Sequence, residues 1–187
     1  MKRTHLLFLL STWIILSSST FLFSSNIHGQ TSDDEYIVNL PLIIRGAELG
    51  SEGITPSEFE QMAIALTNQY RQANGCLSTL TMVPELVAAA RGHSADMAEN
   101  NYFSHNSQNG DLPWDRMKKA GYTDFQSAGE NIAAGYITPE EVIEAWINSP
   151  GHRENMLNCT YNEIGIGYVY DEDSTFRHYW TQDFGQR

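Results

Sequence analysis

The chain has 187 residues and a formal net charge of −12, with 23 acidic side chains against 11 Lys and Arg. A protein that neutralises phosphates needs a basic stripe, but only Arg116, Lys118 and Lys119 gather in this sequence, so nucleic acid is excluded as a partner. The acidic surface instead favours an exported protein that its charge keeps dispersed.

The first 29 residues have the pattern of an export signal. Lys2 and Arg3 precede an apolar run over residues 6–16, which is too short to span a bilayer well. We therefore predict a signal peptide over residues 1–29 and a secreted protein, or one associated with the cell envelope. Because Ile27-His28-Gly29 is a poor cleavage site, an uncleaved anchor or a site near Ser25 is the alternative.

Residues 30–54 are interpreted as a linker or tether. Within them, residues 36–45 are mostly apolar, but Pro41 would sit badly in a central strand. The segment is too short for a membrane span, and its sequence indicates no function.

One domain is predicted over residues 55–187, and about 130 residues are ample for a single hydrophobic core. A capping box at Thr55-Pro56-Ser57-Glu58 begins the first helix, and Asn74-Gly75 ends it. Further helices are expected to begin at Pro84, at Pro113 and at a second capping box that starts with Thr138. A last helical turn is expected over residues 151–158.

The end of the chain changes to the period of a strand. Apolar residues alternate over residues 164–170 and again over residues 176–184, separated by Asp171-Glu172-Asp173-Ser174. This pattern predicts an antiparallel hairpin. With helices early and strands late, the fold class is α+β.

Two cysteines, Cys76 and Cys159, lie outside the signal segment. An even count in an exported chain favours one disulfide, with two free thiols as the alternative.

Three polar residues stand in separate turn-like segments: His105 in Phe-Ser-His, Glu130 in Gly-Glu-Asn, and His152 in Pro-Gly-His. Two imidazoles and a carboxylate suit a divalent ion such as Zn²⁺. The alternative is that the two His bond backbone carbonyls and Glu130 caps a helix. His93 lies on the apolar stripe of the second helix and is expected to be a hydrogen-bonded core residue, while His178 is expected to be a strand residue.

These segments occur in the same order as in the CAP superfamily, the cysteine-rich secretory, antigen 5 and pathogenesis-related proteins, and the chain resembles its compact bacterial form. The resemblance covers about residues 59–185 and also includes Trp146 and the Ile164-Gly165-Ile166-Gly167-Tyr168 strand. It implies a three-layer α-β-α sandwich with a small antiparallel sheet between helices.

The resemblance also implies a cleft lined by His105, Glu130, His152 and Ser149. The first three match the metal-binding positions of the family, whereas Ser149 stands where other members have an acid. A metal is therefore expected to bind more weakly here than in members with all four ligands.

We expect a monomeric binding module for a small hydrophobic ligand such as a lipid, for a peptide, or for a cell-envelope component. The alternative is a metal-assisted hydrolase of peptidase type with Glu130 as base, and a structural envelope protein is third. Nucleophilic catalysis is poorly supported, because neither Ser104 nor Ser149 lies in a Gly-x-Ser-x-Gly elbow and His-Glu-x-x-His is absent from the sequence. Trp114, Trp146 and Trp180 could form an aromatic ligand wall, but large aromatics at these spacings are expected in the core.

Overall fold

The computed structural model describes residues 56–187. The predicted signal peptide, the linker and the Thr55 end of the first capping box lie outside the described residues. Within the described part, no helix is long and apolar enough to cross a membrane.

The predicted helices are confirmed to within a few residues at each end. They are α2 (Pro56–Ala73), α3 (Pro84–Glu99), α4 (Pro113–Lys119), α5 (Pro139–Asn148) and α6 (Pro150–Met156). Each begins with Pro, whose fixed φ suits the first helical position. At the start of α5 the Thr138 hydroxyl accepts a hydrogen bond from the Glu141 N–H at 3.2 Å, and Glu141 accepts one from the Thr138 N–H. Gly75, at φ +95°, follows α2 and lets the chain reverse there.

In the described part of the chain, four strands form one mixed sheet in the order β1-β3-β4-β2. They are β1 (Thr81–Met82), β2 (Ser127–Ala134), β3 (Glu163–Tyr170) and β4 (His178–Gln186). The predicted hairpin is confirmed as the antiparallel pair β3 and β4. The sheet is not wholly antiparallel, because β1 runs parallel to β3. Two residues are too few to show a strand period, so β1 could not be predicted from the sequence.

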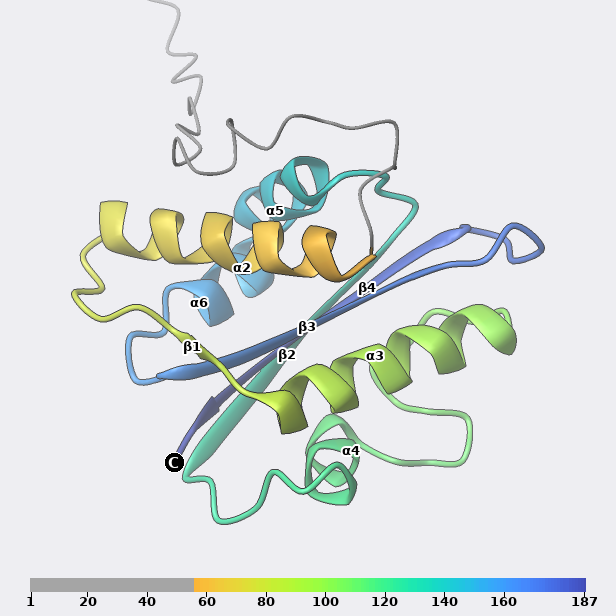
Figure 1. Ribbon diagram of the computed structural model, residues 1–187, viewed down its shortest axis with the longest axis horizontal. Helices are drawn as coiled ribbons and strands as arrows, with labels where there is room; N and C mark the ends of the chain where they lie inside the picture. The colour runs from red at the N-terminus through yellow and green to blue at the C-terminus, as the bar shows by residue number, and fades with distance from the viewer. Residues whose placement is uncertain (1–55) are drawn as a thin grey trace, which may run out of the picture. The chain divides into compact units, whose positions relative to one another are not determined.

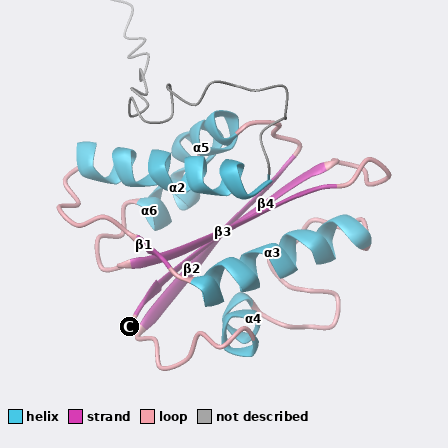
Figure 2. Ribbon diagram, in the orientation of Figure 1, coloured by secondary structure: helices cyan, strands magenta, loops and turns pink. Residues whose placement is uncertain are grey.

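The sheet lies between two helical layers, which confirms the α-β-α sandwich. Helices α2, α5 and α6 cover one face, and α3 with α4 covers the other (Figures 1 and 2). Alternate residues of β4 serve the two layers: Trp180 and Phe184 join the core with α2 and α5, while Tyr179 packs with residues of α3. Since both faces are covered, β4 is buried along almost its whole length.

Helix α3 packs directly on the backbone of β3 because two glycines leave room for it. A Cβ on Gly165 would lie 2.2 Å from the carbonyl carbon of Leu86, and one on Gly167 would lie 2.2 Å from the Arg91 nitrogen. The Ser94 hydroxyl then reaches the Gly167 carbonyl at 3.0 Å. This contact fixes the end of α3, and with it the loop that carries His105.

The predicted disulfide is present between Cys76 and Cys159, with a Cα–Cα distance of 5.3 Å and a sequence separation of 83. Beside it, the buried Arg71 donates hydrogen bonds to the carbonyls of Met156, Asn158 and Tyr161 at 2.7 to 3.0 Å. The disulfide and Arg71 together tie the end of α2 to the segment that follows α6.

Candidate ligand-binding cleft

The loop between α3 and α4 is held to α3 by a buried imidazole. His93 is fully buried, and its Nε2 lies 2.9 Å from the Ser104 carbonyl oxygen. Burial lowers the pKa of His93, which keeps the ring neutral. His93 is therefore the hydrogen-bonded core residue that was predicted, and its role is to position the residues next to His105.

Glu130 lies on β2 and is bound from two sides. The His105 Nδ1 is 2.8 Å from Glu130 Oε1, and Arg116 of α4 forms an ion pair with Oε2. The Glu130 side chain is only 2% exposed, whereas that of His105 is 50% exposed. Arg116 also donates to the His105 carbonyl at 2.9 Å. A single guanidinium therefore ties α4, β2 and the loop together and neutralises the carboxylate.

A second carboxyl group, Asp183, lies directly opposite Glu130 in the β2–β4 register. It is 1% exposed, and its Oδ1 has no hydrogen-bond partner among the described residues. Burial raises the pKa of Asp183 well above its usual value, and the charge of Glu130 raises it further. Because Asp183 has no cation of its own among the described residues, we expect it to retain its proton in the folded protein.

His152 approaches from the opposite side, in the first turn of α6. Its carbonyl accepts a hydrogen bond from Asn131 Nδ2 at 3.1 Å, and Asn155 Nδ2 donates to the Glu130 carbonyl at 3.1 Å. These amides fix α6 to the outer edge of β2. Burial lowers the pKa of His152, and the neighbouring His105 lowers it further, so the neutral form of its ring is favoured.

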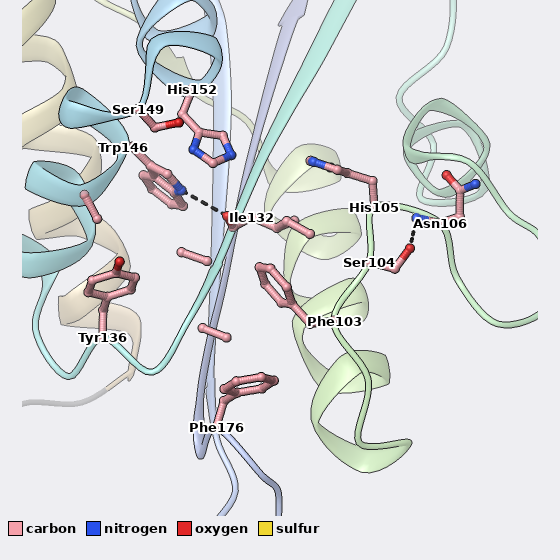
Figure 3. A pocket seen from close by; sticks show the side chains of 13 residues that line it. Phe103, Ser104, His105, Asn106, Ile132, Tyr136, Trp146, Ser149, His152 and Phe176 are labelled. Atoms are coloured by element: carbon pink, nitrogen blue, oxygen red, sulfur yellow. Dashed lines mark hydrogen bonds between the residues drawn. The ribbon is translucent and has the colours of Figure 1, made fainter.

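The two imidazoles face one groove of about 690 Å³ that runs along β2. In Figure 3 the ring of His152 and the side chain of His105 lie on opposite sides of the strand and point toward each other. Ser149 lines the same groove, and beyond the imidazoles its walls are aromatic, formed by Phe103 and Phe176 on one side and by residues of α5 on the other (Figure 3).

Glu130 does not line this groove but borders a smaller pocket of about 220 Å³, which shares His105 and Asn106 with it. Trp114 borders this smaller pocket and is 46% exposed. The expectation that Trp114 is a core residue is therefore wrong, although Trp180 is buried as expected. A residue in the first turn of a seven-residue helix has too little covering structure for so large a ring.

The residues as arranged do not fit a metal ion. Both carboxylate oxygens of Glu130 already have partners, in His105 and Arg116. No group of three or more His, Cys, Asp or Glu residues in the described part of the chain is placed to hold a metal ion. A coordination set would require Glu130 to exchange Arg116 for the ion. Metal binding by His105, Glu130 and His152 therefore stays a prediction, and a ligand in this cleft would be bound by the side chains without an ion.

Two residues that shape the cleft were not identified from the sequence. In the sequence, Arg116 belongs to a small basic cluster with Lys118 and Lys119. This cluster does not indicate that the Arg116 guanidinium contacts Glu130. Asp183 lies between Gln182 and Phe184 in the predicted hairpin. Its side chain is on the opposite face of the sheet from theirs, toward α3. Its position opposite Glu130 follows from the strand register, which the sequence could not supply.

A helical sandwich around a small sheet, with two imidazoles facing a groove on its edge strand, defines the class of protein found in the CAP superfamily. The family model described as the cysteine-rich secretory protein family, CAP, matches residues 64–184. The chain belongs to this family.

Bacterial proteins of the same kind are similar in sequence and structure. The uncharacterized protein YkwD of Bacillus subtilis is 45% identical over 128 residues, which are 68% of this chain and 47% of that protein. An extracellular protein containing an SCP domain from Bacillus anthracis has a solved structure with a TM-score of 0.62 and 35% identity, over 73% of this chain and 45% of that one. An outer surface protein from Borrelia burgdorferi has a TM-score of 0.64 over 73% of this chain and 98% of that one, and at 24% identity it shows the fold alone. The chain spans about half the length of YkwD.

Proposed function

We propose that the protein is an extracellular binding module whose groove along β2 holds an uncharged, partly apolar stretch of a peptide, lipid or cell-envelope ligand. The location is supported by the export-like N-terminus and by the extracellular protein from Bacillus anthracis that the domain resembles.

The observation that carries the proposal is the chemistry of the groove wall. In a chain of net charge −12, the residues among 56–187 that line the groove include no Asp, Glu, Lys or Arg. Glu130, which borders the adjoining smaller pocket, is buried and forms an ion pair with Arg116. Such a site favours a ligand portion without formal charge, because a charged group would lose its hydration and find no opposite charge.

The wall combines apolar surface with a few polar groups that fix orientation, as in most small-molecule and peptide sites. Phe103 and Phe176 have ring centroids 6.0 Å apart and are both more than 40% exposed. His105, His152 and Ser149 supply hydrogen-bonding groups at the other end of the groove. A ligand with an apolar part and a hydrogen-bonding part would therefore lie along β2 in one direction.

The hydrolase alternative has less support. A general base must reach the proton that it removes, but the Glu130 side chain is 2% exposed and both its oxygens have partners. No observation favours turnover over binding.

The test is a binding screen with arrayed peptides, lipids and envelope glycans, in which the full chain is compared with two variants. Ala145 lines the groove, so Ala145→Trp should fill it. Ala88 is an exposed alanine of α3 that does not line the groove, so Ala88→Trp is the matched control. Ligands that bind the wild type and Ala88→Trp but not Ala145→Trp support the proposal. If no class of ligand distinguishes Ala145→Trp, the groove is not the binding site.

A further inference from the structure

The floor of the groove is the outer edge of a sheet. Among residues 56–187, in the order β1-β3-β4-β2, strand β2 has a hydrogen-bonded neighbour strand only on the β4 side. At the other end of the sheet, β1 has two residues against eight in β2. Because β1 pairs with only Glu163 and Ile164, much of β3 also lacks a strand on its outer side in the described part of the chain, but the edge that lines the groove is that of β2.

The strand register shows which main-chain groups point out of this edge. The Gly135 N–H donates to the His178 carbonyl of β4 at 2.8 Å. In an antiparallel pair, every second residue faces the partner strand and the residues between point both N–H and C=O away from it. Ile132 and Ala134 are therefore residues whose main-chain groups point outward into the groove that they line.

Side chains confirm this direction and cover only part of the edge. Trp146 Nε1 donates to the Ile132 carbonyl at 3.2 Å, and Asn155 Nδ2 donates to the Glu130 carbonyl at 3.1 Å, both from outside the sheet. For the Ile132 N–H and for both main-chain groups of Ala134, no hydrogen bond is found within residues 56–187. Figure 3 shows the Trp146 contact at the edge of the strand.

We propose that the groove binds an extended peptide segment, which adds to the sheet as a strand alongside Ile132 and Ala134; this rests on the proposed function of the groove. An added strand presents donors and acceptors at the spacing that these open groups require. Natural proteins usually protect such an edge with charge, Pro or a bulge, and β2 has none of these at residues 131–134.

The groove also suits the side chains of such a segment. Successive side chains of a strand point to opposite sides, and here one side meets Phe103 and Phe176 while the other meets Tyr136 and Ala145. Since no charged residue lines the groove, the segment in contact with it is uncharged and carries apolar side chains.

The experiment uses the full chain and a set of acetylated, amidated hexapeptides in which Thr alternates with Val, Leu or Phe. Hydrogen exchange of single amides is followed by NMR with and without peptide. The peptides should slow exchange at Ile132 and Ala134. Ala133 is the internal control, because its N–H faces β4 and its exchange should change little.

The main-chain hydrogen bonds are then removed in two ways, by Ala134→Pro in the protein and by N-methylation of the peptide. Ala134→Pro deletes one N–H at the end of an edge strand, where Pro is tolerated. It should weaken binding of the tightest peptide about tenfold, since the hydrogen bond to that N–H is lost. Ala134→Ser keeps the N–H and should bind as the wild type does. Two N-methylated forms of the peptide are compared, one methylated at the odd positions and one at the even positions. Only the form whose methyl groups replace the N–H groups that face β2 should bind more weakly. Thermal midpoints of both variants within a few degrees of the wild type verify that the domain is folded.

The outcomes separate this inference from the proposed function. If no hexapeptide binds but lipids or glycans are lost in Ala145→Trp, strand addition is overturned and the groove remains a binding site. If hexapeptides bind equally well to wild type and Ala134→Pro, without slower exchange at Ala134, they bind without joining the sheet and the inference is also overturned. If no ligand distinguishes Ala145→Trp, both ideas fail.

Discussion

Replacing Asp183 with Asn tests whether the buried pair with Glu130 holds a single negative charge. The ordinary Asp pKa is near 3.8, so above about pH 5 the unfolded chain has released this proton while the folded protein retains it. Folding then takes up a proton, and the free energy of unfolding falls as pH rises. For one such group the slope is about 1.4 kcal/mol per pH unit, until Asp183 ionises in the folded state.

Asn has almost the same shape as a protonated Asp but does not titrate in this range. The quantity to follow is the free energy of unfolding of the wild type minus that of Asp183→Asn. This difference should fall by about 1.4 kcal/mol between pH 5 and pH 6. Effects of His105, His152, Arg116 and Glu130 cancel to first order, because these groups are present in both proteins. Urea unfolding followed by Trp fluorescence measures the difference, with Asp173→Asn in the exposed β3–β4 turn as the control for removal of one carboxylate. A difference that stays constant from pH 5 to pH 7 would show that folded Asp183 is ionised, and the charge assignment would be wrong.

Three further changes test the framework of the cleft. Cys159→Ser opens the disulfide loop and should lower the free energy of unfolding by about 4 kcal/mol in the chain-entropy model; an unchanged thermal midpoint would contradict this. Gly167→Ala places a methyl group against the α3 backbone and should lower the free energy of unfolding by about 3 kcal/mol. The control is Gly151→Ala, whose methyl group meets nothing within 4 Å and should leave stability unchanged or slightly higher. Equal effects of the two variants on the urea midpoint would refute the close α3 packing. Arg116→Met leaves Glu130 buried without its cation and should lower the free energy of unfolding by about 3 kcal/mol or more. Adding Glu130→Gln in the same chain should restore part of this loss. A double variant no more stable than Arg116→Met would mean that the ion pair does not stabilise the contact between α4 and β2.

Most of the fold could be predicted because its signals are local. A Pro and a capping box mark where α5 begins, Gly75 marks where the chain turns after α2, and the alternating period marks β3 and β4. Such patterns act over a few residues, so one sequence contains them. β1 could not be predicted, because a two-residue strand forms only where β3 offers it a partner.

The site was predicted only in part, for a physical reason. His105, His152 and Ser149 were placed in the cleft by resemblance to a family, and they line one groove. Whether Glu130 is free to bind a ligand depends on Arg116, which lies 14 residues away in sequence. A long-range ion pair of this kind leaves no periodic signal. The strand edge at Ala134 was not foreseen either, because strand order and register decide which edge stays open.

The central claim is that the groove along β2 binds its ligand without a metal ion, and one measurement tests it most directly. The tightest ligand from the screen is titrated calorimetrically into the wild type and Ala145→Trp, each with and without EDTA. We expect the wild-type affinity to be the same in EDTA, and the affinity of Ala145→Trp to be at least about tenfold weaker, as expected when a ring occupies the ligand's place. Loss of wild-type binding in EDTA, or equal affinity in Ala145→Trp, would contradict the account.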